Sequence, residues 1–197
     1  MIILQGRCAN STMPNLPQIH ATSLEGLMIL HRKPLTDSRG FFERMFCHNE
    51  LLSVMHSRSI CQVNRTVTIN RGTLRGLHFQ HAPHAELKIV SCLRGEVYDI
   101  AVDLRRNSPT FLEWHAEILN HNNNLSVMIP EGFAHGFQTL TDDCEMIYFH
   151  TAEYSAVAES GVNCLDPRLA IIWPEVVTGW SSRDASIALL ENDFSGV

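Results

Sequence analysis

The chain of 197 residues is 45% hydrophobic and 18% charged, which is typical of one soluble globular domain with a sizeable core. Its formal net charge of −6 excludes a broad basic surface for nucleic acid or an anionic membrane, so a phosphorylated ligand would need a local cluster of Arg and Lys. No apolar run approaches the roughly 20 residues of a membrane span, and we expect neither a nucleic-acid nor a membrane partner.

Residues 1–18 are predicted to be an N-terminal extension, because Pro14 and Pro17 among polar residues argue against regular structure. A single domain is expected over residues 19–197. Within it, short apolar or alternating runs between turn residues predict strands over 27–30, 40–46, 87–93, 96–104, 114–119, 125–129, 136–140 and 145–151. We interpret 87–93 and 96–104 as a hairpin around Arg94 and Gly95.

Helix signals are few. Residues 49–56 could form one or two turns, and Ser182 could cap a helix over 184–191. Short strands at a spacing of roughly 8–12 residues predict an all-β sandwich or barrel, with a double-sheet jelly roll favoured and a small helical segment at the C-terminal end.

The six cysteines are scattered, without a C-x-x-C pair. The apolar start of the chain, residues 1–4, is too short for the core of a signal peptide. Both observations indicate reduced thiols in a cytoplasmic protein.

The segment from residue 70 to residue 88 is rich in side chains that can carry chemistry: Arg71, Arg75, His78, His81, His84, Glu86 and Lys88. If it lines the mouth of a barrel, an imidazole, a guanidinium and an ammonium converge on one ligand. From spacing alone, a half-buried structural histidine fits His78 equally well, and Arg75 and Lys88 could form a solvated rim.

A metal site is not expected. Jelly rolls often hold a metal with an H-x-H pair, a carboxylate and a later histidine, but residues 78–80 read His-Phe-Gln and offer an amide instead. His135 follows turn residues and could simply brace a turn. Tyr148 lies in an apolar run, where an inward tyrosine is more often part of the core.

Several sequence blocks resemble the dTDP-4-dehydrorhamnose 3,5-epimerase family. They are 75–80 (RGLHFQ), Lys88, 95–105 (GEVYDIAVDLR), 108–111 (SPTF), 129–137 (IPEGFAHGF), 166–167 (DP) and 172–174 (IWP). They occur in the family's order and cover about residues 24–190. The resemblance implies a cupin-type jelly roll, a homodimer, no metal and no cofactor.

The resemblance also implies roles for individual residues. His78 corresponds to the catalytic base, Asp184 to the carboxylate that orients it, Lys88 to the group that steadies an enolate oxygen, and Tyr148 to the acid on the opposite face. Residues at nucleotide, phosphate or further ligand contacts are Arg39, Phe42, Gln62, Asn64, Arg75, His135, Tyr154, Glu159 and Arg183. The implied substrate is a nucleoside-diphosphate 4-keto sugar.

These residue types suit that chemistry. The protons at C3 and C5 of a 4-keto sugar are acidic, because the enolate left behind is conjugated with the carbonyl. Histidine, with an ordinary pKa of about 6.5, is a competent base near pH 7. A carboxylate can fix its tautomer, a lysine can stabilise the developing oxyanion, and arginines can bind the diphosphate.

One departure from the family pattern concerns Arg44, which occupies the position of an acidic residue that reads the base, while Glu43 sits one place early. In a strand this shift moves the carboxylate to the other face. Arg44 offers only donors, which suits cytosine better than thymine, so CDP is a candidate nucleotide. Alternatively, Arg44 points away and the backbone reads the base. Glu86 and Val63 also replace a glutamine and an acid of the family pattern.

Three other functions remain open from the sequence. The chain could invert only C5 of a CDP-linked 3,6-dideoxy-4-keto sugar, or only one carbon of a related substrate. It could be a metal-dependent cupin oxygenase or isomerase. It could also be a non-catalytic cupin that binds sugar nucleotides, although binding alone does not need His78, Lys88, Tyr148 and Asp184 together.

Overall fold

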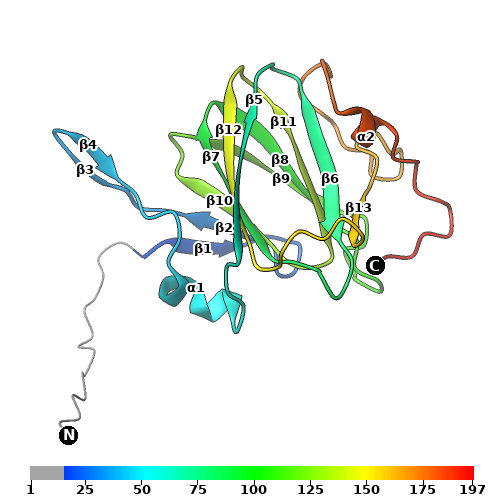
Figure 1. Cartoon of the computed structure of the whole chain (residues 1–197), viewed down its shortest axis with the longest axis horizontal. Coiled ribbons are helices and arrows are strands. Elements are labelled where there is room, and N and C mark those ends of the chain that lie inside the picture. Colours follow the sequence, from blue (N-terminus) through cyan, green and yellow to red (C-terminus); the bar gives the residue numbers. More distant parts are fainter. Residues whose placement is uncertain (1–15) are drawn as a thin grey trace, which may run out of the picture.

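The structure is a computed structural model that describes residues 16–197, and it consists almost entirely of strands (Figure 1). The strands are β1 (Gln18–Ala21), β2 (Met28–His31), β3 (Leu35–Asp37), β4 (Gly40–Phe42), β5 (Gln62–Thr68), β6 (Leu74–Gln80), β7 (Lys88–Arg94), β8 (Glu96–Asp103), β9 (Trp114–Asn120), β10 (Leu125–Ile129), β11 (Phe133–Thr139), β12 (Cys144–His150) and β13 (Glu159–Gly161). Most of the predicted extension, residues 1–15, lies outside the described residues, and Gln18 already belongs to β1.

Two antiparallel sheets face each other. One has the strand order β1-β2-β10-β7-β12-β5, and the other has the order β13-β6-β11-β8-β9. The strands β3 and β4 form a separate hairpin that stands away from the sandwich (Figure 1). The predicted all-β jelly roll is confirmed.

The space between the sheets holds an apolar core at one end and polar side chains at the other. Along β12, Met146 packs in the core, and the next inward residues, Tyr148 and His150, line a cavity. Along β7, Val90 packs in the core and Lys88 lines the cavity. Because successive side chains of a strand alternate between its faces, each strand contributes to core and cavity from the same face.

The outer faces of the two sheets are also covered. Helix α1 (His48–Met55) packs Leu51 and Met55 against the six-stranded sheet. Side chains of the chain after β13, among them Leu169 and Trp173, pack against the five-stranded sheet. Burying each large apolar side chain contributes about 1.5–3 kcal/mol, so these layers hold the two sheets in place around the cavity.

The predicted hairpin around Arg94 and Gly95 is wrong, because β7 and β8 belong to different sheets. Both strands direct apolar side chains, Val90 and Val97, into the same core between the sheets. Gly95 has a positive φ of 75°, and a Cβ there would lie 2.8 Å from Cys144 Sγ, so the turn crosses from one sheet to the other beside β12. Two strands that pair in one sheet and two strands that face each other across the core have the same alternation of apolar and polar residues. The pattern therefore could not show whether β7 and β8 form a hairpin or lie in different sheets.

The first predicted helix, 49–56, is confirmed as α1 within one residue. The second is much shorter than predicted: α2 covers only Ser182–Ala185, and Ser181 rather than Ser182 caps it. Backbone groups farther along bond to an earlier loop instead of continuing the helix, since Asn163 donates to the Ile187 carbonyl and the Leu190 N–H donates to Asp166. Among the described residues no helix is long and apolar enough to cross a membrane.

Five strands, β1, β3, β5, β6 and β13, were not predicted, and the predicted strand 40–46 ends at Phe42. β5 lies at the edge of the six-stranded sheet, and most of its side chains are exposed. Such a strand carries no clean alternation of apolar and polar residues, which explains why the pattern did not reveal it.

Candidate active site

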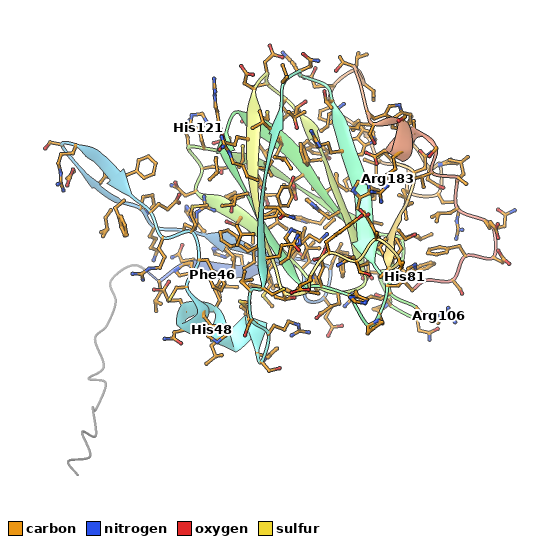
Figure 2. All side chains as sticks on the ribbon, viewed as in Figure 1. Phe46, His48, His81, Arg106, His121 and Arg183 are labelled. Atoms are coloured by element: carbon orange, nitrogen blue, oxygen red, sulfur yellow. The ribbon has the colours of Figure 1, made fainter. Side chains whose placement is uncertain are left out.

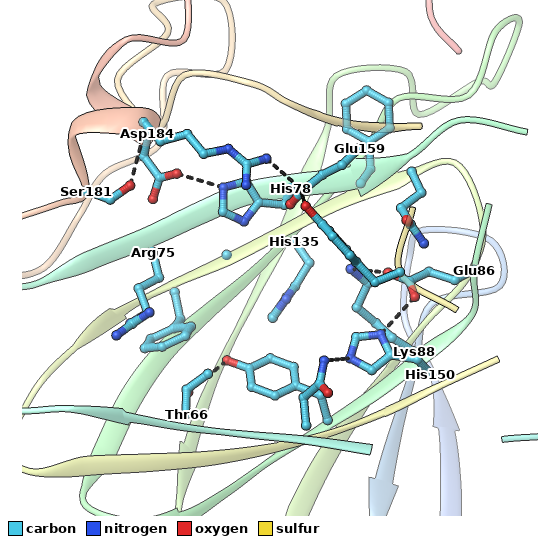
Figure 3. Close-up of a pocket in the computed structure, with 18 of the residues that line it drawn as sticks. Thr66, Arg75, His78, Glu86, Lys88, His135, His150, Glu159, Ser181 and Asp184 are labelled. Carbon is cyan, nitrogen blue, oxygen red and sulfur yellow. Dashed lines mark hydrogen bonds and ion pairs between the residues drawn. The ribbon is translucent and has the colours of Figure 1, made fainter. Parts of the chain in front are cut away.

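A cavity of about 530 Å³ lies between the two sheets (Figure 3). Most of the predicted site residues line it: Gln62, Asn64, Arg75, His78, Lys88, His135, Tyr148, Tyr154, Glu159, Arg183 and Asp184. They come from both sheets, from the loop after β12 and from α2. Residues as far apart as 62 and 184 in the sequence therefore surround one volume. Three other histidines labelled in Figure 2, His48, His81 and His121, do not line it.

A bulge in β6 turns both Arg75 and His78 toward the cavity. β6 pairs with β11 through His78 and His135, and then through Arg75 and Phe137, so one strand has an extra residue between the two pairs. A regular strand would direct side chains three residues apart to opposite faces. Gly76 makes the bulge possible, because its φ is 113° and a Cβ there would lie 2.6 Å from the carbonyl oxygen of His135.

His78 is bonded to a buried carboxylate. Its Nε2 lies 2.8 Å from Asp184 Oδ1, and Asp184 Oδ2 also accepts from the backbone N–H of Gly76 at 3.4 Å. Asp184 is only 5% exposed, and Ser181 fixes its backbone by accepting from the Asp184 N–H. An ionised Asp184 requires the proton on Nε2, so Nδ1 is the ring nitrogen that carries a lone pair.

Lys88 belongs to a second polar cluster on the opposite sheet. Its Nζ lies 3.0 Å from Glu86 Oε1, and Glu86 Oε2 lies 2.8 Å from His150 Nδ1. The other nitrogen of His150 lies 3.4 Å from Asn64 Nδ2 (Figure 3). Lys88 and Glu86 are both buried, so each charge depends on its partner.

Tyr148 projects from the same sheet as Lys88. Its hydroxyl lies 3.4 Å from Thr66 Oγ1, and its ring packs edge-on against His135 and flat against His150. Burial raises the pKa of Tyr148 well above its ordinary value, so the hydroxyl keeps its proton at neutral pH. His135 is held by a buried hydrogen bond of 2.8 Å to Asp99.

A small network lies at the mouth of the cavity. The Tyr154 hydroxyl donates to Glu159 Oε2 at 2.6 Å, and the same oxygen is 2.7 Å from Arg183 Nη2. The backbone N–H of Tyr154 donates to Gln62. These bonds connect the loop after β12 to α2 and to the edge strand β5.

Arg75 is the cation that remains available for an anionic ligand. In the part of the chain that the structure describes, its guanidinium donates to Thr68 Oγ1 at 2.8 Å and to the Val67 carbonyl at 3.3 Å. Lys88 and Arg183, by contrast, are each paired with a carboxylate. A phosphate oxygen could therefore bind Arg75 without displacing an internal ion pair.

Three predicted ligand residues lie elsewhere in this chain. Arg39 and Phe42 sit on the β3–β4 hairpin, where Phe42 is 66% exposed and Arg39 pairs with Asp37. Arg44 pairs with Glu50 of α1 beside a second, smaller cavity. The argument that alternation along a strand turns Glu43 to the other face does not apply, because β4 ends at Phe42. The Glu43 carboxylate instead accepts a hydrogen bond from Arg32 at 2.7 Å.

Across residues 16–197, no group of three or more His, Cys, Asp or Glu side chains is arranged to hold a metal ion. Gln80, at the position where a metal-binding jelly roll would carry a second histidine, uses its amide for backbone contacts. It donates to the carbonyls of His84 and Glu153 and accepts from the Ser155 N–H. Its role is to connect two loops at the rim.

The site residues that the sequence analysis did not predict include His150 and Asp99. His150 lies two residues after Tyr148, so strand alternation could have assigned it to the same face. Asp99 and His135 are diagonal neighbours on the paired strands β8 and β11. Predicting their contact would have required knowledge of the register of these two strands.

Comparisons with known proteins agree with this architecture. A model of the dTDP-4-dehydrorhamnose 3,5-epimerase family matches residues 21–192. The dTDP-4-dehydrorhamnose 3,5-epimerase of Methanothermobacter thermautotrophicus is 41% identical over 155 residues, which cover 78% of this chain and 82% of that protein.

Two solved structures are also similar. The dTDP-6-deoxy-D-glucose-3,5-epimerase of Legionella pneumophila, in complex with dTDP-4-keto-L-rhamnose, has a TM-score of 0.83 and 38% identity and covers 88% of this chain and 92% of its own. A 3'-monoepimerase from Streptomyces bikiniensis, in complex with dTDP-quinovose, has a TM-score of 0.72 and 31% identity and covers 89% and 84%.

The jelly roll and the cavity, together with matches over most of the chain, define a carbohydrate epimerase, which is an isomerase. The chain belongs to the dTDP-4-dehydrorhamnose 3,5-epimerase family. The resemblance found in the sequence and the cupin-type fold are thereby confirmed.

Proposed function

We propose that this enzyme inverts C3, C5 or both carbons of a dTDP-linked 4-keto-6-deoxy sugar through an enolate. The observation that carries the proposal is the position of His78 and Tyr148 on facing sheets of one cavity, which Lys88 also lines. Inversion requires a base on one face of the sugar and an acid on the other. The proton transfers leave no net oxidation or reduction, so the reaction requires no redox cofactor.

His78 acts as the base through Nδ1. As Nδ1 takes the proton from the sugar carbon, the imidazole becomes a cation, and the buried Asp184 at 2.8 Å from Nε2 stabilises that charge. General-base catalysis of this kind contributes about 10²–10⁴-fold to the rate. Asp184 is a positioning residue, because it acts through His78 and not on the sugar.

Lys88 stabilises the enolate. Its ammonium is nearly buried, and a positive donor in such a site stabilises a developing oxyanion more strongly than one in water. Tyr148 delivers a proton to the opposite face, and its raised pKa keeps that proton in place until the enolate has formed. Arg75, Gln62 and Asn64 form the part of the cavity proposed to bind the nucleotide and its phosphates.

The proposed nucleotide is dTDP rather than CDP. The enzymes from Methanothermobacter thermautotrophicus and Legionella pneumophila are named for dTDP-linked sugars, and two of the similar structures were solved with dTDP-linked compounds bound. The case for CDP depended on Arg44 facing the base, but the guanidinium of Arg44 is already paired with Glu50 of α1. We therefore favour neither the CDP-linked alternative nor a non-catalytic binding protein.

A direct test compares turnover of dTDP- and CDP-linked 4-keto-6-deoxy-D-glucose, with NMR to assign the product configuration at C3 and C5. We expect inversion at one or both carbons and at least about a tenfold higher kcat/KM for the dTDP compound, which corresponds to about 1.4 kcal/mol. Calorimetry with dTDP and CDP gives the matching binding preference. A clear preference for CDP contradicts the nucleotide assignment, and no inversion of either compound contradicts the proposed activity.

We also propose that two copies of the chain associate through the β3–β4 hairpin. The hairpin and its side chains stand away from the sandwich of the same copy (Figure 2). Its apolar residues Leu35, Phe41 and Phe42 are 55–66% exposed. Apolar surface of this kind calls for a partner. In the proposed homodimer the hairpin carries Arg39 and Phe42 to the cavity of the second copy, which accounts for both residues lying outside their own cavity.

Mixing two weakly active variants tests this arrangement. If a site takes His78 from one copy and Phe42 from the other, a heterodimer of His78→Ala and Phe42→Ala has one intact site. We therefore expect two weakly active variants to regain activity after their subunits exchange, with sedimentation showing dimers throughout. A protein that sediments as a monomer, or heterodimers without regained activity, would contradict the arrangement.

The proposed location is the cytoplasm. The five cysteines of residues 16–197 are unpaired, and Cys92, Cys144 and Cys164 are buried. Burial raises the pKa of the Cys92 and Cys164 thiols to about 12, which keeps them unreactive. Cell fractionation would test the location.

A further inference from the structure

Glu86 occupies an unusual position for a carboxylate. It is only 9% exposed, lies in the loop just before β7, and bridges Lys88 Nζ at 3.0 Å and His150 Nδ1 at 2.8 Å. Figure 3 shows this bridge on the wall of the cavity across from the pair of His78 and Asp184. The mechanism above uses Lys88 and leaves both Glu86 and His150 without a task.

We propose that Glu86 and His150 are positioning residues of the epimerase site, in which Glu86 holds the Lys88 ammonium against the enolate oxygen and His150 orients the Asn64 amide toward the nucleotide. The inference rests on the proposed function, which defines the tasks of Lys88 and Asn64. It adds a physical connection between the end of the cavity that performs the chemistry and the end that binds the nucleotide.

The charges support the first half of the network. The side chains of Lys88 and Glu86 are each 8% exposed, and a buried ammonium requires a counter-ion. Burial alone would raise the pKa of Glu86, but the hydrogen bond from His150 and the charge of Lys88 hold that pKa below its ordinary value. Glu86 is therefore ionised at neutral pH, and among residues 16–197 it is the carboxylate paired with Lys88.

The tautomer of His150 supports the second half. An ionised Glu86 requires the proton on Nδ1 of His150, which leaves the lone pair on Nε2. Asn64 Nδ2 lies 3.4 Å from that nitrogen and donates to it, so the amide has one preferred orientation. The His150 ring also stacks on Tyr148 at 6.0 Å between centroids, which limits its rotation.

Two variants separate the ends of the network. Glu86→Gln keeps the shape but removes the charge that holds Lys88, so we expect kcat to fall by about ten- to hundredfold while KM stays within about threefold. His150→Asn retains a donor at the position of Nδ1 but cannot reach Asn64. We expect it to raise KM by about five- to tenfold and to change kcat less.

Glu145→Gln is the matched control. It neutralises a carboxylate of the same sheet that pairs with Arg65 at 2.6 Å and does not line the cavity, so kcat and KM should both match those of the wild type. Thermal melting and calorimetry with dTDP show whether each variant is folded.

The outcomes separate this inference from the proposed function. Wild-type enzyme without turnover would overturn both. If the wild type is active, either of two results would overturn this inference alone. One is an unchanged kcat in Glu86→Gln, and the other is a joint change of kcat and KM in both Glu86→Gln and His150→Asn. If Glu86→Gln does not fold, an unchanged KM in His150→Asn decides against the inference.

Discussion

Replacing His78 with alanine is expected to lower kcat by about two to four orders of magnitude, because the cavity then lacks the base that removes the proton. The sugar should still bind, since Arg75, Lys88 and the rim of the cavity are unchanged. Turnover monitored by NMR gives kcat, and calorimetry with dTDP should give a dissociation constant close to that of the wild type.

His81→Ala is the control for this variant. His81 lies three residues farther along, is exposed and does not line the cavity, so its loss should leave kcat unchanged. A His78→Ala enzyme with wild-type turnover would contradict the assignment of the base. A fall of equal size in both variants would instead point to a general disturbance of the segment.

Replacing Asp184 with asparagine is expected to lower kcat by about 10³–10⁴-fold with little change in substrate affinity. The asparagine amide can donate to Nε2 of His78, which then holds the lone pair, and the proton moves to Nδ1, the nitrogen that must act as the base. The shape of the site is kept, but the tautomer is wrong. Nitrogen chemical shifts of His78 report the tautomer directly, beside the measurement of kcat.

Asp193→Asn provides the comparison for Asp184, because it neutralises an exposed carboxylate of the same C-terminal segment. It should leave both kcat and the tautomer of His78 unaltered. Wild-type turnover in Asp184→Asn would show that the pairing at 2.8 Å is structural and does not support the base.

The sequence predicted the strands β7 to β12 well, but it did not predict β6 or most of the exposed strands. The strands β7 to β12 bury one face in a shared core, so their alternation is strong and their bounds agree within a few residues. The edge strand β5 and the hairpin strands β3 and β4 are exposed and have little such pattern. Which strands pair was not predictable either, because the turn at Gly95 has the same residues whether it closes a hairpin or crosses between sheets.

The candidate site was predicted through the family resemblance rather than through spacing. Spacing alone left His78, Lys88 and Tyr148 with structural alternatives, because their convergence depends on the facing of two sheets and on the bulge at Gly76. The hydrogen bond between His150 and Glu86 was not predictable, because the two residues are 64 positions apart in the sequence. Their contact depends on the register between β12 and β7, which only the folded sheet defines. The pairing of Arg44 with Glu50 was not predictable, because Glu50 lies on a helix whose packing the sequence did not indicate.

The exchange of solvent deuterium into the sugar tests the central claim most directly. When wild-type enzyme acts on the dTDP-linked 4-keto sugar in D₂O, deuterium should appear at each carbon that is inverted. His78→Ala should abolish this exchange, whereas Tyr148→Phe should retain exchange at the carbon beside His78 and lose inversion. Inversion without deuterium in the wild type, or unchanged exchange in His78→Ala, would contradict proton abstraction by His78.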